Sequence, residues 1–86
     1  MGVIVKGGVR LNVEDRVITT LEATNQELTL ELKPREADQV VLYFPNGSVQ
    51  VYNLDYIVSG QVLQWSGYSL ETLIESGDRV KISYPI

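Results

Sequence analysis

The sequence predicts a small all-β protein, an antiparallel β-sandwich or partly open barrel of about six to eight strands with an N-terminal extension. One observation behind this prediction is the alternation of polar and apolar residues with the period of two of half-buried strands. A second is the recurrence of turn-forming dipeptides, such as Asn-Gly and Gly-Asp, roughly every 8–12 residues. A third is the length of 86 residues, which suits one domain.

The first clear strand covers Glu27–Lys33, where polar residues alternate with leucines. This alternation predicts that Leu28, Leu30 and Leu32 share the buried face. Pro34 is expected to end the strand, because a proline has no N–H group for the ladder. The next strand, Gln39–Phe44, is almost continuously apolar, so we expect it to be covered on both faces.

A hairpin is expected at Pro45-Asn46-Gly47, because Asn-Gly suits the positive φ angles of a tight turn. Its return strand is Ser48–Tyr52, with Val49 and Val51 on one face. Asp55 then interrupts the pattern and is the one formal charge between residues 39 and 70. We interpret it as a turn residue whose carboxylate accepts backbone hydrogen bonds. The uncharged stretch around it is expected to hold most of the core.

Two further strands are predicted at Tyr56–Val58 and Gln61–Trp65, separated by Ser59-Gly60. Leu63 and Trp65 lie two residues apart and are expected to share a face.

The C-terminal segment begins with residues 69–75, whose apolar residues have a helical spacing. Ser69 would cap a single helical turn there, and an irregular loop is the alternative. Gly77-Asp78 is expected to turn the chain into a last strand, Arg79–Tyr84. The residues of this strand expected to face the core are Val80, Ile82 and Tyr84.

The first 26 residues are less regular than residues 27–86, which we assign to the sandwich domain. Their strand-like fragments are Val3–Val5, Val9–Val13 and Val17–Leu21, interrupted by Gly7-Gly8 and by Glu14-Asp15-Arg16. They are expected either to add strands to the same sheet or to form an arm that pairs with an exposed sheet edge of a neighbour.

The composition argues against catalysis. The chain has neither cysteine nor histidine, so it lacks the thiolate nucleophile, the commonest general base and the commonest metal ligands. Glu14 and Asp15 are adjacent, and on a strand they would point to opposite faces and could not act as a pair. We therefore expect a protein that is not an enzyme, with no catalytic residues, no metal and no cofactor.

The charge and hydropathy pattern also restricts the partners. A formal net charge of −4 leaves no basic surface of the kind that nucleic-acid binding requires. No apolar run approaches the roughly 18 residues of a membrane span. We expect neither nucleic acid nor a membrane as a partner.

The aromatic residues are the best candidates for contacts with a ligand or a partner. Tyr52 and Tyr68 are expected to be exposed, and with Trp65 they would offer ring faces to sugars. This favours a carbohydrate-binding module that recognises a host surface as the alternative function. Trp65 is also in register with core leucines, so packing in the core is the competing interpretation for that residue.

The last half of the chain carries an ordered set of motifs that resembles a known family. The motif residues are Asn46-Gly47, Gln50, Asp55-Tyr56, Val58, Gly60, Leu63, Trp65, Gly77-Asp78 and Tyr84. Together they resemble the small β-sandwich module of tailed-bacteriophage virion proteins, especially tail fibres. The chain departs from that pattern by a longer insert at Ser66–Ser76 and by having Trp65 where fibres often carry phenylalanine or threonine. Residues 1–26 have no counterpart in the module.

The resemblance implies a structural protein located in the virion, with motif residues that shape the fold. A free-standing protein of this size is expected to be a capsid decoration (cement) protein, or a small neck, baseplate or tail-fibre fitting. Its partners would then be other virion proteins of the capsid, neck or tail. By analogy with the family it would form a homo-oligomer such as a trimer.

Overall fold

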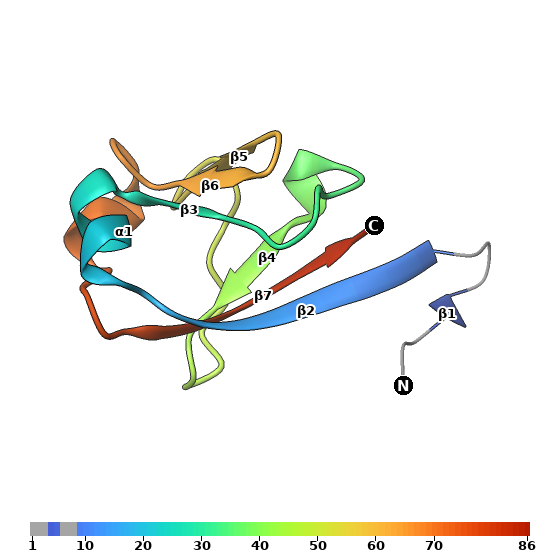
Figure 1. The fold of residues 1–86 in the computed structure, drawn as a ribbon, viewed down its shortest axis with the longest axis horizontal. Coiled ribbons are helices and arrows are strands. Elements are labelled where there is room, and N and C mark those ends of the chain that lie inside the picture. The colour runs from blue at the N-terminus through green and yellow to red at the C-terminus, as the bar shows by residue number, and fades with distance from the viewer. Residues whose placement is uncertain (1–3, 6–8) are drawn as a thin grey trace.

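Two antiparallel sheets face each other with the buried side chains between them (Figure 1). The computed structural model describes residues 4–5 and 9–86. In this part of the chain the larger sheet has the order β1-β2-β7-β4 and the smaller one the order β3-β6-β5. The predicted small all-β fold is confirmed.

The elements follow one another along the chain in a simple order. The strands are β1 (Ile4–Val5), β2 (Val9–Val17), β3 (Glu27–Thr29), β4 (Val41–Tyr43), β5 (Ile57–Ser59), β6 (Val62–Gln64) and β7 (Arg79–Pro85). The helical elements are α1 (Thr20–Asn25) and the 3₁₀ turns η1 (Ala37–Gln39) and η2 (Ser69–Thr72).

Strand β2 pairs with β7 from Leu11 opposite Pro85 to Val17 opposite Arg79. The predicted break at residues 14–16 is therefore wrong, because these residues continue the strand. The predicted fragment at residues 17–21 is also different, since α1 begins at Thr20. The predicted Val3 and Gly7-Gly8 lie outside the described residues.

A capping box fixes the start of α1. The hydroxyl oxygen of Thr19 accepts a hydrogen bond from the Glu22 amide at 3.1 Å, and the Glu22 carboxylate accepts one from the Thr19 amide at 2.9 Å. Both bonds satisfy amides that a helix start leaves without partners. The threonine followed three residues later by glutamate is a pattern that could have been recognised in the sequence.

Strand β3 is shorter than predicted. Leu28 and Leu30 are buried, but Leu32 is 43% exposed, so its predicted inward position is wrong. The ladder ends when the Leu30 amide bonds to the Gln61 carbonyl at 2.8 Å. The Leu32 amide instead bonds to the Tyr84 hydroxyl at 3.1 Å. Once the chain leaves the ladder, the alternation of faces no longer applies.

The predicted hairpin at residues 45–47 forms, with a three-residue turn. The Gly47 amide bonds to the Phe44 carbonyl at 2.9 Å, and the Phe44 amide bonds to the Ser48 carbonyl at 3.0 Å. Gly47 has a φ of 86°, whereas Asn46 is not among the residues with positive φ. The predicted return strand is reduced to isolated bridges, one of which joins Tyr43 and Val49.

Two predictions about single residues of loops have different outcomes. The Asp55 carboxylate accepts a hydrogen bond from the Val51 amide at 2.6 Å, which confirms its interpretation as a turn residue. Ser69 starts η2, but Tyr68 occupies the cap position and makes no side-chain capping bond. The predicted cap at Ser69 is therefore wrong.

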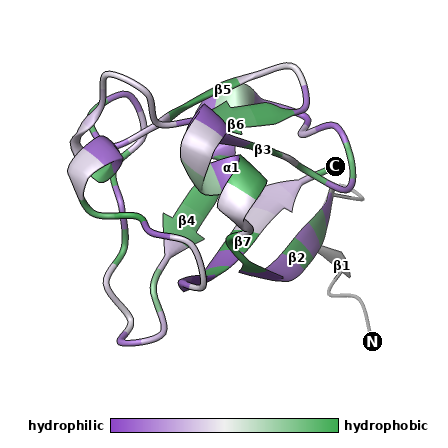
Figure 2. Ribbon diagram, turned by 60° about the vertical axis from the view of Figure 1, so that its left-hand side comes forward, coloured by the Kyte–Doolittle hydropathy of each residue, from purple (hydrophilic) through white to green (hydrophobic). Residues whose placement is uncertain are grey.

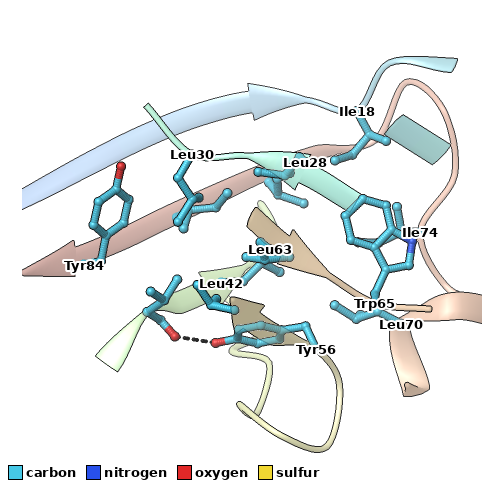
Figure 3. Packing of buried hydrophobic residues seen from close by; sticks show 14 residues of the cluster. Ile18, Leu28, Leu30, Leu42, Tyr56, Leu63, Trp65, Leu70, Ile74 and Tyr84 are labelled. Atoms are coloured by element: carbon cyan, nitrogen blue, oxygen red, sulfur yellow. Dashed lines mark hydrogen bonds between the residues drawn. The ribbon is translucent and has the colours of Figure 1, made fainter. Parts of the chain in front are cut away.

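The core lies between the sheets and contains large side chains from both (Figure 3). Leu63 and Trp65 from the β6 segment share a face, as predicted, and both are buried. The ring of Tyr56 is also enclosed, and its hydroxyl donates a hydrogen bond to the Val40 carbonyl. The core-facing residues of β7 are the predicted set of Val80, Ile82 and Tyr84.

Candidate functional site

The aromatic residues predicted to contact a ligand do not form one platform. Trp65 is 1% exposed and lies in the core (Figure 3), so its ring has no face to offer to a ligand. Tyr52 is half-buried and packs edge to face against Tyr56, with ring centroids 5.8 Å apart. Tyr68 is half-buried beside η2. Two partly exposed tyrosines remain of the three predicted contacts.

A stronger candidate surface lies on β2, whose polarity is inverted. Its apolar residues Leu11, Val13 and Val17 are 46%, 52% and 49% exposed and lie on the outer face of the sheet. Glu14 faces the interior instead and is 3% exposed. Figure 2 shows the alternation as hydrophobic and hydrophilic bands along β2. A strand that covers a core normally has the opposite arrangement.

A hydrogen-bonded network stabilises the polar inner face of β2. The Glu14 carboxylate accepts bonds from the Arg16 guanidinium at 2.7 Å, the Glu31 amide at 2.9 Å and the Tyr84 hydroxyl. The Tyr84 oxygen in turn accepts a bond from the Asn12 amide group at 2.9 Å. Burial, and then the adjacent Glu14 carboxylate, raise the pKa of Tyr84. These donors offset the cost of burying the Glu14 charge.

The network continues from β2 to the smaller sheet and to α1. Arg16 donates to the Thr29 carbonyl at 3.0 Å and to the Glu22 carboxylate at 3.1 Å. Among the described residues, no buried side-chain nitrogen or oxygen lacks a hydrogen-bond partner. Glu14 is thus held by donors on all sides, which suits a structural role rather than proton transfer. Its neighbour Asp15 points to the outer face, as the alternation predicts.

The backbone of β2 presents an open edge on the side away from β7. The Ile86 amide bonds to the Arg10 carbonyl at 2.9 Å, and the Ile18 amide bonds to the Asp78 carbonyl at 2.8 Å. In an antiparallel pair such bonds alternate along the strand, so the even-numbered residues of β2 bond to β7. The N–H and C=O groups of the odd-numbered residues Leu11, Val13, Asp15 and Val17 therefore point along the plane of the sheet, to the side away from β7.

Along the edge of β2 away from β7, the described strand β1 pairs with Val9 and Arg10 alone. Within residues 4–5 and 9–86, no strand pairs with the outer edge of residues 11–17. We call these residues, with their outward backbone groups and exposed side chains, the open edge of β2. An unpaired edge of this kind is a template for a strand from another chain.

A groove of about 410 Å³ lies on the outer face beside the open edge. Its apolar lining includes Val17, Tyr43, Phe44 and Pro45. The hairpin that follows β4 projects past β7 and β2 (Figure 1) and forms one wall. Residues of β2, β7 and β4 thus contribute to one concave surface.

The groove also contains the cations Arg79 and Lys81. Arg79 is exposed, lies opposite Val17 and makes no ion pair within the part of the chain that the structure describes. The Lys81 ammonium lies 3.7 Å from the Asp15 carboxylate, and both groups are largely exposed. An exposed pair of this kind contributes little to stability, so both cations are available to an acidic group.

No protein-family model, curated protein or solved structure matches this chain. Among the residues that the structure describes, no group of acidic side chains is arranged to hold a metal ion. The described helices include none that is long and apolar enough to cross a bilayer. Interpretation of the site therefore depends on its own geometry.

The sequence predicts strand-like fragments at residues 9–13 and 17–21 but does not identify this site. Apolar and polar residues alternate from Val9 to Glu14, and Asp15 interrupts the pattern before Val17. The alternation alone would assign Leu11, Val13 and Val17 to the core, because buried faces are normally apolar. Their outward position depends on partners of Glu14 that are distant in the sequence, the Glu31 amide beyond the end of β3 and the Tyr84 hydroxyl on β7, and these cannot be recognised locally.

Proposed function

We propose that the chain is a non-enzymatic structural protein of a tailed-bacteriophage virion, which attaches to neighbouring virion proteins through the open edge of β2. The observation that carries the mode of attachment is the exposure of Leu11, Val13 and Val17 on a strand with outward backbone groups. The resemblance of residues 45–84 to the tail-fibre module supports the virion assignment. A capsid decoration protein is the form of this role that we favour.

The chemistry of the surface supports a protein partner. The open edge combines apolar side chains with backbone donors and acceptors, which another polypeptide strand can pair with. A net charge of −4 does not favour the phosphate backbone of a nucleic acid. Carbohydrate binding has less support, because Trp65 is buried and Tyr52 packs against Tyr56.

Particle association tests this proposal. The tagged chain is expressed in the cells that produce the phage, particles are purified by density gradient, and the chain is quantified by immunoblot. We expect it in the particle fraction at a fixed ratio to the major capsid protein. Absence of the wild-type chain from purified particles would overturn the virion role.

A triple variant tests the attachment surface. Leu11→Thr, Val13→Thr and Val17→Thr remove exposed apolar groups and leave a β-branched residue with strand propensity at each position. We expect about a tenfold loss of particle-bound chain, because truncated interface anchors commonly cost that much.

The matched control replaces three other exposed leucines on different elements, Leu21, Leu54 and Leu73, by threonine. Thermal melts establish that both triple variants fold. Equal particle association of the two variants would show that attachment does not use the open edge.

A further inference from the structure

We propose that the open edge of β2 accepts an extended segment of the neighbouring protein, and that this segment carries an acidic side chain that pairs with Arg79 in the groove. The proposal names the chemistry of the partner and rests on the function proposed above. The occupant is a strand with apolar residues at alternate positions and a carboxylate on the same face.

The backbone of the open edge favours an extended occupant. Its outward N–H and C=O groups belong to every second residue from Leu11 to Val17, which is the spacing of a β ladder. An added strand would lie about 4.8 Å from β2 and present alternate side chains to the outer face. Apolar residues of that strand would cover Leu11 and Val13, which are about half-exposed.

The groove determines where the acidic side chain belongs. A residue of the added strand opposite Val17 lies about 10 Å from the β7 backbone at Arg79, which is two strand spacings. An arginine and a glutamate side chain together cover this distance. Arg79 has no ion-pair partner among the described residues, and Lys81 lies on the same face. A carboxylate at this position therefore finds a cation that the chain itself leaves free.

A second copy of the chain fits this surface poorly. The two-fold antiparallel register that pairs residues 11–17 of two copies puts Glu14 opposite Glu14, about 4.5 or 5.5 Å apart at Cα. Like charges directly opposite each other destabilise a strand pair. The same register puts Leu11 of the other copy opposite Val17, so it supplies no acidic group to Arg79. A different protein segment is favoured.

A pair of synthetic peptides provides the test. The first is the blocked heptapeptide Glu-Thr-Val-Thr-Val-Thr-Val, which in an antiparallel register has its glutamate opposite Val17 and its valines opposite Asp15, Val13 and Leu11, and the second has lysine in place of glutamate. Each is titrated into the ¹⁵N-labelled full chain, and amide shifts are followed by NMR. We expect the glutamate peptide to shift the amides of Leu11, Val13, Asp15 and Val17 and to bind about tenfold more tightly than the lysine peptide.

Charge-reversal variants identify the cations that discriminate between the peptides. Arg79→Glu with Lys81→Glu is expected to reverse the order of the two affinities. Lys33→Glu with Arg35→Glu gives the same net charge at exposed positions outside the groove, and we expect it to keep the wild-type order. Folding of both double variants is checked from the dispersion of the same spectra.

Three results would overturn the proposal. One is the absence of shifts in residues 11–17 at millimolar glutamate peptide, and another is an unchanged order of affinities in the Arg79→Glu, Lys81→Glu variant. The third is a dimeric chain in solution whose odd-numbered β2 amides are already protected from hydrogen exchange. The particle-association assay tests the virion role, and the peptide titration tests strand binding at the open edge. Each proposal can therefore fail independently of the other.

Discussion

At the scale of single residues, Glu14 has the greatest influence on β2. Its carboxylate is buried and holds Arg16, Tyr84 and the Glu31 amide together. Replacing one partner of a buried pair leaves the others without compensation. The inner face of β2 is thus stable only while this one charge is present.

We expect Glu14→Leu to lower the free energy of unfolding by about 3 kcal/mol, because Arg16 and Tyr84 lose their shared acceptor. Urea denaturation followed by circular dichroism measures this change. The exposed Glu36→Gln serves as the control and is expected to change stability by less than about 0.5 kcal/mol. Equal stability of the two variants would mean that the network contributes nothing.

Tyr56 gives the chain a dependence on alkaline pH. Burial raises the pKa of Tyr56 from 10.0 to about 12. The folded chain therefore keeps the phenolic proton at pH values where the unfolded chain has lost it. The stability that Tyr56 contributes is complete below pH 10 and is lost as the pH rises towards 12.

We expect the free energy of unfolding of the wild type to fall by about 2 kcal/mol more than that of Tyr56→Phe between pH 10 and 12. The phenylalanine variant starts from a lower stability, because it leaves the Val40 carbonyl without its donor. Tyr84 is present in both proteins and does not affect the difference. Parallel stability curves would contradict this assignment.

At the scale of elements, the sequence predicts strands better than it predicts their faces. The alternation in β7 places Val80, Ile82 and Tyr84 correctly, because burying this apolar set puts the charged residues Arg79 and Lys81 on the opposite, solvent-facing side. The same reasoning fails for β2, where a hydrogen-bonded network replaces apolar burial. It also fails for Leu32, because the chain leaves the ladder after Leu30.

Leucines 30 and 32 therefore provide a test of element boundaries. Leu30→Ala is expected to cost about 3 kcal/mol, because its side chain is enclosed in the core. Leu32→Ala removes the same atoms from an exposed position and is expected to cost less than about 1 kcal/mol. Thermal or urea unfolding of the two variants gives the comparison. Similar losses would place Leu32 in the core after all.

At the scale of the whole molecule, the N-terminal segment is integral to the described fold. Strand β2 covers one edge of β7, and the residue that follows it, Ile18, is buried in the core. Its Glu14 also bonds to Tyr84 on β7 and to the Glu31 amide in the segment that follows β3. Residues 9–18 thus contribute pairing, packing and charge to the same unit as residues 27–86.

We expect a chain that lacks residues 1–17 to be unfolded at 25 °C, because it exposes β7 and loses the Glu14 network. Circular dichroism and the dispersion of amide resonances measure the result. The milder Thr19→Ala variant, which removes the helix cap, is expected to remain folded and to lose about 1 kcal/mol. A folded truncated chain would show that residues 27–86 are sufficient.

The candidate site could not be predicted at this scale from the sequence. The groove brings together Val17, Tyr43 and Arg79, which meet only because β7 lies between β2 and β4. Hydropathy and spacing report local structure, whereas this strand order is set by contacts between distant segments. Tyr52 and Tyr68, the contacts that the sequence predicts, do not line the groove.

The pairing of β2 with β7 also fixes when this protein can fold. Among the described residues, residues 11–17 pair with residues 79–85 alone, so nearly the whole chain separates the two halves of the ladder. Closing so long a loop has a large entropic cost and makes folding slow compared with that of local structures. During synthesis the first long strand must therefore wait until β7 has left the ribosome. Throughout that interval the N–H and C=O groups of β2 that later bond to β7 have no strand partner.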